Sequence, residues 1–108
     1  MVLREYSLKT PREDIIDIID QVREAITAIG IADGIAIVYC PHTTAGITIN
    51  ENADPDVARD ILLGLDAAFS NRREFRHAEG NSAAHMKASA VGSSVTVIVE
   101  GGRPVLGT

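Results

Sequence analysis

The 108-residue sequence lacks several features that would direct it to a particular class of protein. Its single cysteine, Cys40, excludes a disulfide within the chain and favours the cytoplasm. No apolar run approaches the roughly 20 residues that span a membrane, and residues 1–6 are too polar for a signal peptide. Positive charge is not in excess: the formal net charge of −5 argues against duplex nucleic acid as a partner. We expect one domain over residues 1–108, with no membrane and no nucleic-acid partner.

The apolar pattern predicts two main helices. The first has Thr10 as a cap, Pro11 at the first helical position, isoleucines at helical spacing and Gly30 at its end. The second begins at Asp54-Pro55, with an apolar face that runs as far as Phe69. We predict a short helix of small residues over residues 82–90 and a loop over residues 71–81.

Period-two patterns and turn residues predict several strands. The expected strands are residues 3–9, a buried strand at residues 34–40, residues 47–50, residues 93–100 and residues 103–106. Gly101-Gly102 predicts the hairpin turn between the last two. Strands that alternate with few helices indicate an α+β fold with an antiparallel sheet.

All three histidines lie in two polar segments that are rich in small residues. His42 stands in the first segment, residues 40–51, and His77 and His85 bracket the second. Imidazole is well suited to proton transfer near neutral pH and is the commonest metal ligand. If the two segments meet in space, they form one polar, reactive site. The plainer alternatives are that a backbone carbonyl satisfies His42 and that His77 is exposed on a basic loop.

The first segment offers groups suited to an anionic or polyhydroxylated ligand. Thr43 and Thr44 supply hydroxyls and Asn50 an amide, while Glu51 is a candidate base or metal ligand. Asp54 has two compatible interpretations, as the cap of the second helix and as a site carboxylate. Cys40 is better explained by packing than by nucleophilic chemistry.

The second segment carries a predicted anion site. The turn Gly80-Asn81-Ser82 leads into a helix whose first N–H groups favour an anion. Lys87 and Arg103 either contact a phosphate or are simply solvated. Three imidazoles, those of His42, His77 and His85, can hold zinc with a fourth position open, although the eight-residue gap between His77 and His85 is not a standard metal spacing.

Three ordered motifs closely resemble the signature of the YjbQ-like family. They are the run from Cys40 to Glu51 followed by Asp54-Pro55, the block His77-x-x-Gly80-Asn81-x-x-Ala84-His85, and the closing stretch from Gly92 to Thr108. The resemblance covers essentially the whole chain. The family pattern continues past Leu106-Gly107-Thr108 with a further strand, so we expect a sheet edge to lack its neighbour in this chain.

The resemblance implies an antiparallel β-sandwich with two main helices packed on it, assembled as a homotrimer with a pocket near subunit boundaries. It also implies a secondary thiamine-phosphate synthase activity, which joins hydroxymethylpyrimidine diphosphate to thiazole phosphate and releases pyrophosphate. The expected ligand is thus a small phosphorylated metabolite. The expected catalytic residues are His42, Glu51, Asp54 and His85. The expected substrate-binding residues are Thr43, Thr44, Asn50, Gly80, Asn81, Ser82 and Lys87.

Two other function classes are compatible with these residues. A metal-assisted hydrolase would use zinc on His42, His77 and His85 to activate water, whereas the synthase would use magnesium to neutralise the diphosphate. A binding module for a small anion would turn nothing over. The resemblance to the YjbQ-like family favours the transferase.

Overall fold

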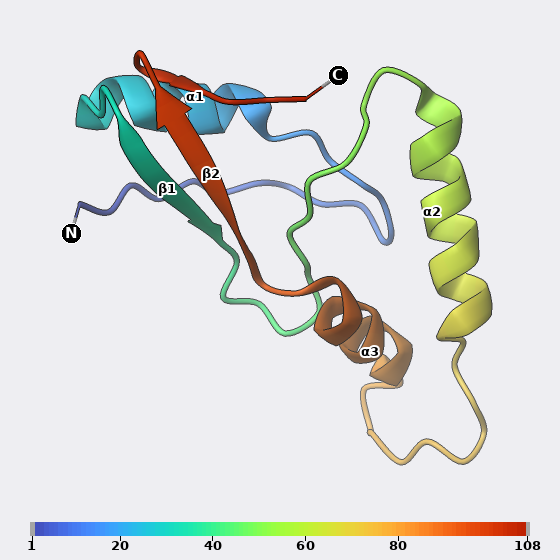
Figure 1. The fold of residues 1–108 in the computed structure, drawn as a ribbon. Coiled ribbons are helices and arrows are strands. Elements are labelled where there is room, and N and C mark those ends of the chain that lie inside the picture. The colour runs from blue at the N-terminus through green and yellow to red at the C-terminus, as the bar shows by residue number, and fades with distance from the viewer. Residues whose placement is uncertain (1, 108) are drawn as a thin grey trace. The chain divides into compact units, whose positions relative to one another are not determined.

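The computed structural model describes residues 2–107, which fall into two compact units. The first unit combines the residues up to Ile37 with those from Thr96 onward, and the second is Val38–Val95. The elements within residues 2–107 are, in order, α1 (Ile19–Ile29), β1 (Gly34–Tyr39), α2 (Pro55–Ala68), α3 (Ser82–Val91), β2 (Ser94–Glu100) and β3 (Arg103–Pro104) (Figure 1). The unit boundary falls inside β1 and again inside β2, so both strands belong to both units.

The strands form one sheet in the order β1-β2-β3. Strands β2 and β3 are antiparallel, with Val99 opposite Pro104 and Glu100 opposite Arg103. The two residues between them, Gly101 and Gly102, have φ angles of 59° and 74°. Positive φ at both central positions is the backbone of a type I′ turn, whose twist suits a hairpin. The predicted glycine hairpin is therefore confirmed.

The core of the first unit lies between α1 and the inner face of the hairpin. Ile26 of α1 is 1% exposed and Val99 of β2 is 2% exposed, and α1 packs along β3. Two hydrogen bonds tie the turn to the loop after α1. The Gly101 N–H donates to Asp33 Oδ1 at 3.1 Å, and the Gly102 N–H donates to the Ala32 carbonyl at 2.8 Å.

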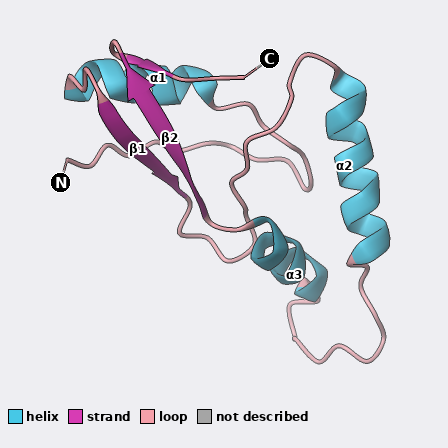
Figure 2. Cartoon of the chain, viewed as in Figure 1, coloured by secondary structure: helices cyan, strands magenta, loops and turns pink. Residues whose placement is uncertain are grey.

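The second unit contains α2 and α3, joined by a long loop (Figure 2). Asp54 caps α2, since its Oδ1 accepts a hydrogen bond from the Asp56 N–H at 2.9 Å, and Pro55 follows in the first turn. This start was predicted. The predicted helix over residues 82–90 and the predicted loop before it are also confirmed, because α3 spans Ser82–Val91.

The predicted start of the first helix is wrong. Helix α1 begins at Ile19, and no helix precedes it within residues 2–18 (Figure 2). Two aspartates explain the delay: Asp14 Oδ1 accepts from the Ile15 N–H and Asp17 Oδ1 accepts from the Ile19 N–H. Such local bonds compete with the helical hydrogen bonds of the same N–H groups. The isoleucine spacing alone could not reveal this competition.

Three strand predictions also need correction. Residues 3–9 and residues 47–50 form no strand. In the first of these segments, Arg4 instead donates to Glu24 Oε1 of α1 at 2.9 Å, and this hydrogen bond with that to Tyr6 raises the pKa of Arg4. Strand β1 is present but not buried, since Ile35 and Ile37 are 61% and 64% exposed.

The predicted sandwich is not confirmed. Residues 2–107 form a single sheet of three strands, and the chain is a mixed structure of helices and antiparallel strands. Burial in β2 alternates, so one face of this strand is covered and the other is open. In the part of the chain that the structure describes, no helix is both long and apolar enough to cross a membrane.

Two glycines should respond oppositely to substitution. Gly102 has positive φ, so Gly102→Val should lower the free energy of unfolding by about 1–3 kcal/mol. Gly64 lies inside α2, and a Cβ there would meet no atom within 4 Å, so Gly64→Ala should raise it by roughly 0.5–1 kcal/mol. Urea denaturation measures both changes. Equal effects of the two substitutions would contradict this account.

Candidate functional site

His42 opens a tight turn at the start of the first polar segment. The Ala45 N–H donates to the His42 carbonyl at 3.2 Å, which places Thr43 and Thr44 at the centre of the turn. The three side chains are exposed. An imidazole and two hydroxyls are therefore presented to solvent from a short closed loop, as a ligand site requires.

The turn is held against the far end of α3 by backbone contacts. The Ile47 N–H donates to the Gly92 carbonyl and the Cys40 N–H donates to the Ser93 carbonyl, each at 2.9 Å. Between them, Gly46 lies so close to α3 that a Cβ there would be 2.7 Å from Val91 Cγ1. The first polar segment and α3 thus meet, and a glycine is what allows the approach.

The other residues of the first segment make local hydrogen bonds. Asn50 Oδ1 accepts from the Glu51 N–H at 2.7 Å, and Asp54 is the cap of α2. Asn50, Glu51 and Asp54 are all exposed. The capping interpretation of Asp54 is confirmed, and its function as a site carboxylate stays a prediction.

The second polar segment also begins with a histidine turn. The Gly80 N–H donates to the His77 carbonyl at 3.0 Å, and Gly80 has a φ of 72°, which favours glycine. His77 and Gly80 are exposed, while Ser82 and His85 are half-buried in the first turns of α3. His42 and His77 therefore occupy equivalent first positions of two tight turns.

The start of α3 is capped by a residue that sequence reasoning missed. Asn81 stands at the cap position but makes no side-chain capping bond, and its buried Oδ1 has no partner within residues 2–107. Asn71 Oδ1 accepts the Ala83 N–H instead, at 3.2 Å. Because Asn71 is twelve residues from Ala83, no local motif signals this contact.

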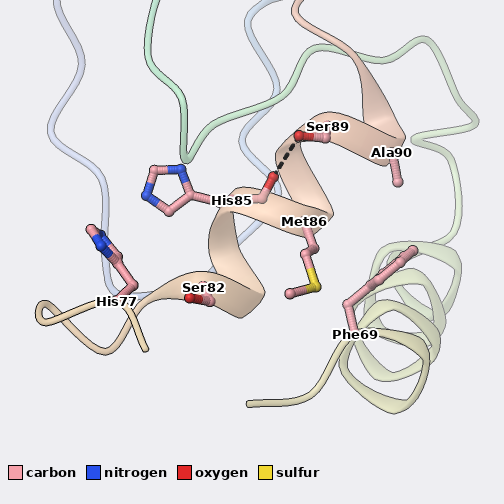
Figure 3. A pocket seen from close by; sticks show the side chains of 7 residues that line it. All are labelled: Phe69, His77, Ser82, His85, Met86, Ser89 and Ala90. Atoms are coloured by element: carbon pink, nitrogen blue, oxygen red, sulfur yellow. Dashed lines mark hydrogen bonds between the residues drawn. The ribbon is translucent and has the colours of Figure 1, made fainter. Parts of the chain in front are cut away.

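His77 and His85 meet at one side of α3. Their ring centroids are 5.3 Å apart and the rings are nearly perpendicular, at 81° (Figure 3). No comparable ring contact involves His42 within residues 2–107. The structure thus brings two of the three predicted histidines together.

An open hollow of about 710 Å³ adjoins this histidine pair. Its lining includes His77, Ser82, His85, Met86 and Phe69 of the second unit. Figure 3 shows the His85 ring beside the His77 ring, and Met86 extending from α3 between Ser82 and Phe69. The hollow is wide open to solvent and has apolar residues beside two histidines and a serine. Phe69 was predicted only as part of the apolar face of α2, so its place here was missed.

Lys87, a predicted phosphate ligand, is held by a carboxylate. Its Nζ lies 3.0 Å from Asp66 Oδ1 of α2, and the lysine side chain is 16% exposed. This ion pair joins α2 to α3 beside the hollow. An incoming anion at Lys87 would have to compete with Asp66 for the ammonium group.

The described residues, 2–107, do not bring together the ligands of a metal centre within one chain. Among residues 2–107, no three histidine, cysteine, aspartate or glutamate side chains are placed to hold one ion. The pair of His77 and His85 supplies two nitrogen donors, fewer than the three protein ligands that catalytic zinc sites usually have.

Sequence and structure comparisons agree on one group of proteins. The model of the family "UPF0047 protein YjbQ-like" matches residues 4–108. UPF0047 protein YugU of Bacillus subtilis is 53% identical over 109 residues, covering 99% of this chain and 83% of the relative. UPF0047 protein MJ1081 of Methanocaldococcus jannaschii is 50% identical over 108 residues, which cover 99% of this chain and 78% of the relative. The crystal structure of an uncharacterized conserved protein of this family from Clostridium acetobutylicum superimposes with a TM-score of 0.93 at 57% sequence identity. The superposition covers 98% of this chain and 83% of the crystallised chain.

Substitution of Gly46 should separate the first polar segment from α3. Gly46→Ala places a methyl group 2.7 Å from Val91 Cγ1 and 3.1 Å from the Gly92 carbonyl oxygen. We expect a loss of about 1–3 kcal/mol in unfolding free energy from this overpacking. Denaturation measures the loss, with Gly64→Ala as the matched control. A neutral Gly46→Ala would contradict the close approach.

Loss of the Asn71 side chain should weaken the start of α3. Asn71→Ala removes the acceptor for the Ala83 N–H, which should cost about 1 kcal/mol. Asn71→Asp keeps an acceptor and should retain most of the stability. Hydrogen exchange of the Ala83 amide measures the effect locally. Unchanged protection in Asn71→Ala would show that this bond is dispensable.

Proposed function

The chain belongs to the UPF0047 (YjbQ-like) family, and we propose that it is a transferase with thiamine-phosphate synthase activity. In this reaction the thiazole nitrogen attacks the methylene carbon of hydroxymethylpyrimidine diphosphate. A new C–N bond forms as the C–O bond breaks, and pyrophosphate leaves with the electron pair. The observation that carries the proposal is the contact of His77 with His85 beside a hollow with an apolar wall.

Two needs of the reaction match this hollow. The pyrimidine and thiazole rings are flat and need a wall against which they can be oriented, which Phe69 and Met86 supply. The departing pyrophosphate gains negative charge and needs a proton or positive charge nearby. In our proposal the His85 imidazolium donates that proton, with His77 beside it.

The other predicted residues have supporting functions in this proposal. Thr43, Thr44 and Asn50 provide polar groups for the substrates, and the turn at Gly80–Ser82 and Lys87 provides donors for phosphate. Glu51 and Asp54 are the carboxylates available for the pyrimidine amine or for a magnesium ion that accompanies the diphosphate. His42 contributes a second proton donor from its own turn.

We further propose that the chain assembles as a homotrimer in the cytoplasm. The open face of the first unit carries Ile35, Ile37 and Ile98, which are 61%, 64% and 59% exposed. Neighbouring apolar side chains that are this exposed are typical of an interface. The lone Cys40 supports a reducing compartment.

Histidine substitutions test the proposed reaction. His85→Ala should lower the turnover of thiamine phosphate by on the order of 10²-fold, because a positioned proton donor is lost. His42→Ala should lower it as well. Product is measured by chromatography of the trimer fraction with added magnesium. Arg59→Ala, which removes an exposed side chain that pairs with its neighbour Asp60, is the control and should leave turnover unchanged. Wild-type turnover in both histidine variants would refute the assignment.

Elemental analysis of untagged protein separates this transferase from a zinc hydrolase. We expect well below one zinc per chain, since the His77–His85 pair offers only two donors. About one zinc per chain that is lost in His85→Ala would instead favour the hydrolase.

A further inference from the structure

A second hollow lies in the first unit and is lined by two arginines. Its volume is about 490 Å³, and its lining consists of Arg23, Thr27, Gly101, Gly102, Arg103 and Pro104. All of these residues belong to the first unit, whereas the histidine hollow belongs to the second. We propose that this arginine hollow is a binding site for a phosphate-type oxyanion.

The two arginines come from two packed elements. Arg23 and Thr27 are four residues apart on α1, which places them on one face of the helix. Arg103 is the first residue of β3, and β3 packs on α1. Two arginines and one threonine thus line the same hollow. Guanidinium binds phosphate oxygens through paired N–H donors, which makes this set suited to a phosphate group.

The backbone that presents Arg103 is fixed before any ligand arrives. Gly101 and Gly102 form the type I′ turn, and their N–H groups are bonded to Asp33 Oδ1 and to the Ala32 carbonyl. The adjoining ladder continues, since the Val105 N–H donates to the Ile98 carbonyl at 2.8 Å. A site on a pinned hairpin loses less entropy on binding than one on a free loop.

The carboxylates near the hollow leave both arginines available to bind an anion. Within residues 2–107, the Arg103 side chain has no hydrogen bond or ion pair. Arg23 has Asp20 at 3.9 Å, and the Asp20 side chain is 94% exposed, so solvent screens this pair. Asp33 is engaged by the Gly101 amide, and Glu100 lies opposite Arg103 in the ladder. None of these carboxylates lines the hollow, so an anion there would meet the two positive groups.

Titration of the 108-residue chain with phosphate and pyrophosphate at constant ionic strength tests the site. NMR should detect shifts of the Arg23 and Arg103 Nε–H signals and of the Gly101 and Gly102 amides. Arg23→Gln and Arg103→Gln should each weaken binding by about tenfold, the loss expected for a charged hydrogen-bonding partner. Glu100→Gln should tighten it by about twofold, because an opposing charge is removed next to Arg103.

Three controls test whether the binding is specific to the arginine hollow. Arg59→Gln removes an arginine of the second unit and should leave the affinity within twofold of wild type. His85→Ala should leave the affinity that is read from the Arg23 and Arg103 signals unchanged, because His85 lines the other hollow, so that failure of the proposed transferase and failure of this site are distinguishable. Equal shifts with sodium chloride, or wild-type affinity in both Arg23→Gln and Arg103→Gln, would overturn the proposal.

Discussion

The close approach of Gly46 to α3 is the constraint on which the candidate site depends. With no side chain at Gly46, the Ile47 amide reaches the Gly92 carbonyl and the Cys40 amide reaches the Ser93 carbonyl. These bonds bring the segment that carries His42 to the helix that carries His85. The two polar segments are thus linked through the backbone, and no ring contact joins His42 to the other histidines within residues 2–107.

A second constraint, in the loop before α3, positions His77. The loop before α3 is closed by the Asn71–Ala83 bond and by the turn that ends at Gly80, and His77 lies between these two fixed points. A long loop with two internal closures loses conformational freedom before a ligand binds. His77 of this loop contacts His85, with the two rings nearly perpendicular. The same loop leaves Asn81 Oδ1 buried without a partner in the described part of the chain, a polar atom that a ligand or water could satisfy.

Local patterns predicted the elements whose signals are local. The cap at Asp54, the glycine turn at Gly101-Gly102 and the alternation of β2 are confirmed, because each depends on residues within a few positions of one another. The isoleucine spacing that predicted a helix from Pro11 was overridden by Asp14 and Asp17, which bond nearby N–H groups. Exposure of β1 was also unpredictable, since a strand pattern does not tell whether its second face is covered.

The sequence by itself determined the chemical inventory: three imidazoles, their two polar segments, and the family to which the motifs belong. Only the tertiary structure decided which groups are neighbours. It paired His77 with His85, engaged Lys87 with Asp66, gave the cap of α3 to Asn71 and set Arg23 and Arg103 in the lining of one hollow. The physical reason is that the two residues of each pair are at least eight positions apart in the sequence. Such contacts depend on how helices and loops pack, which no local sequence pattern encodes.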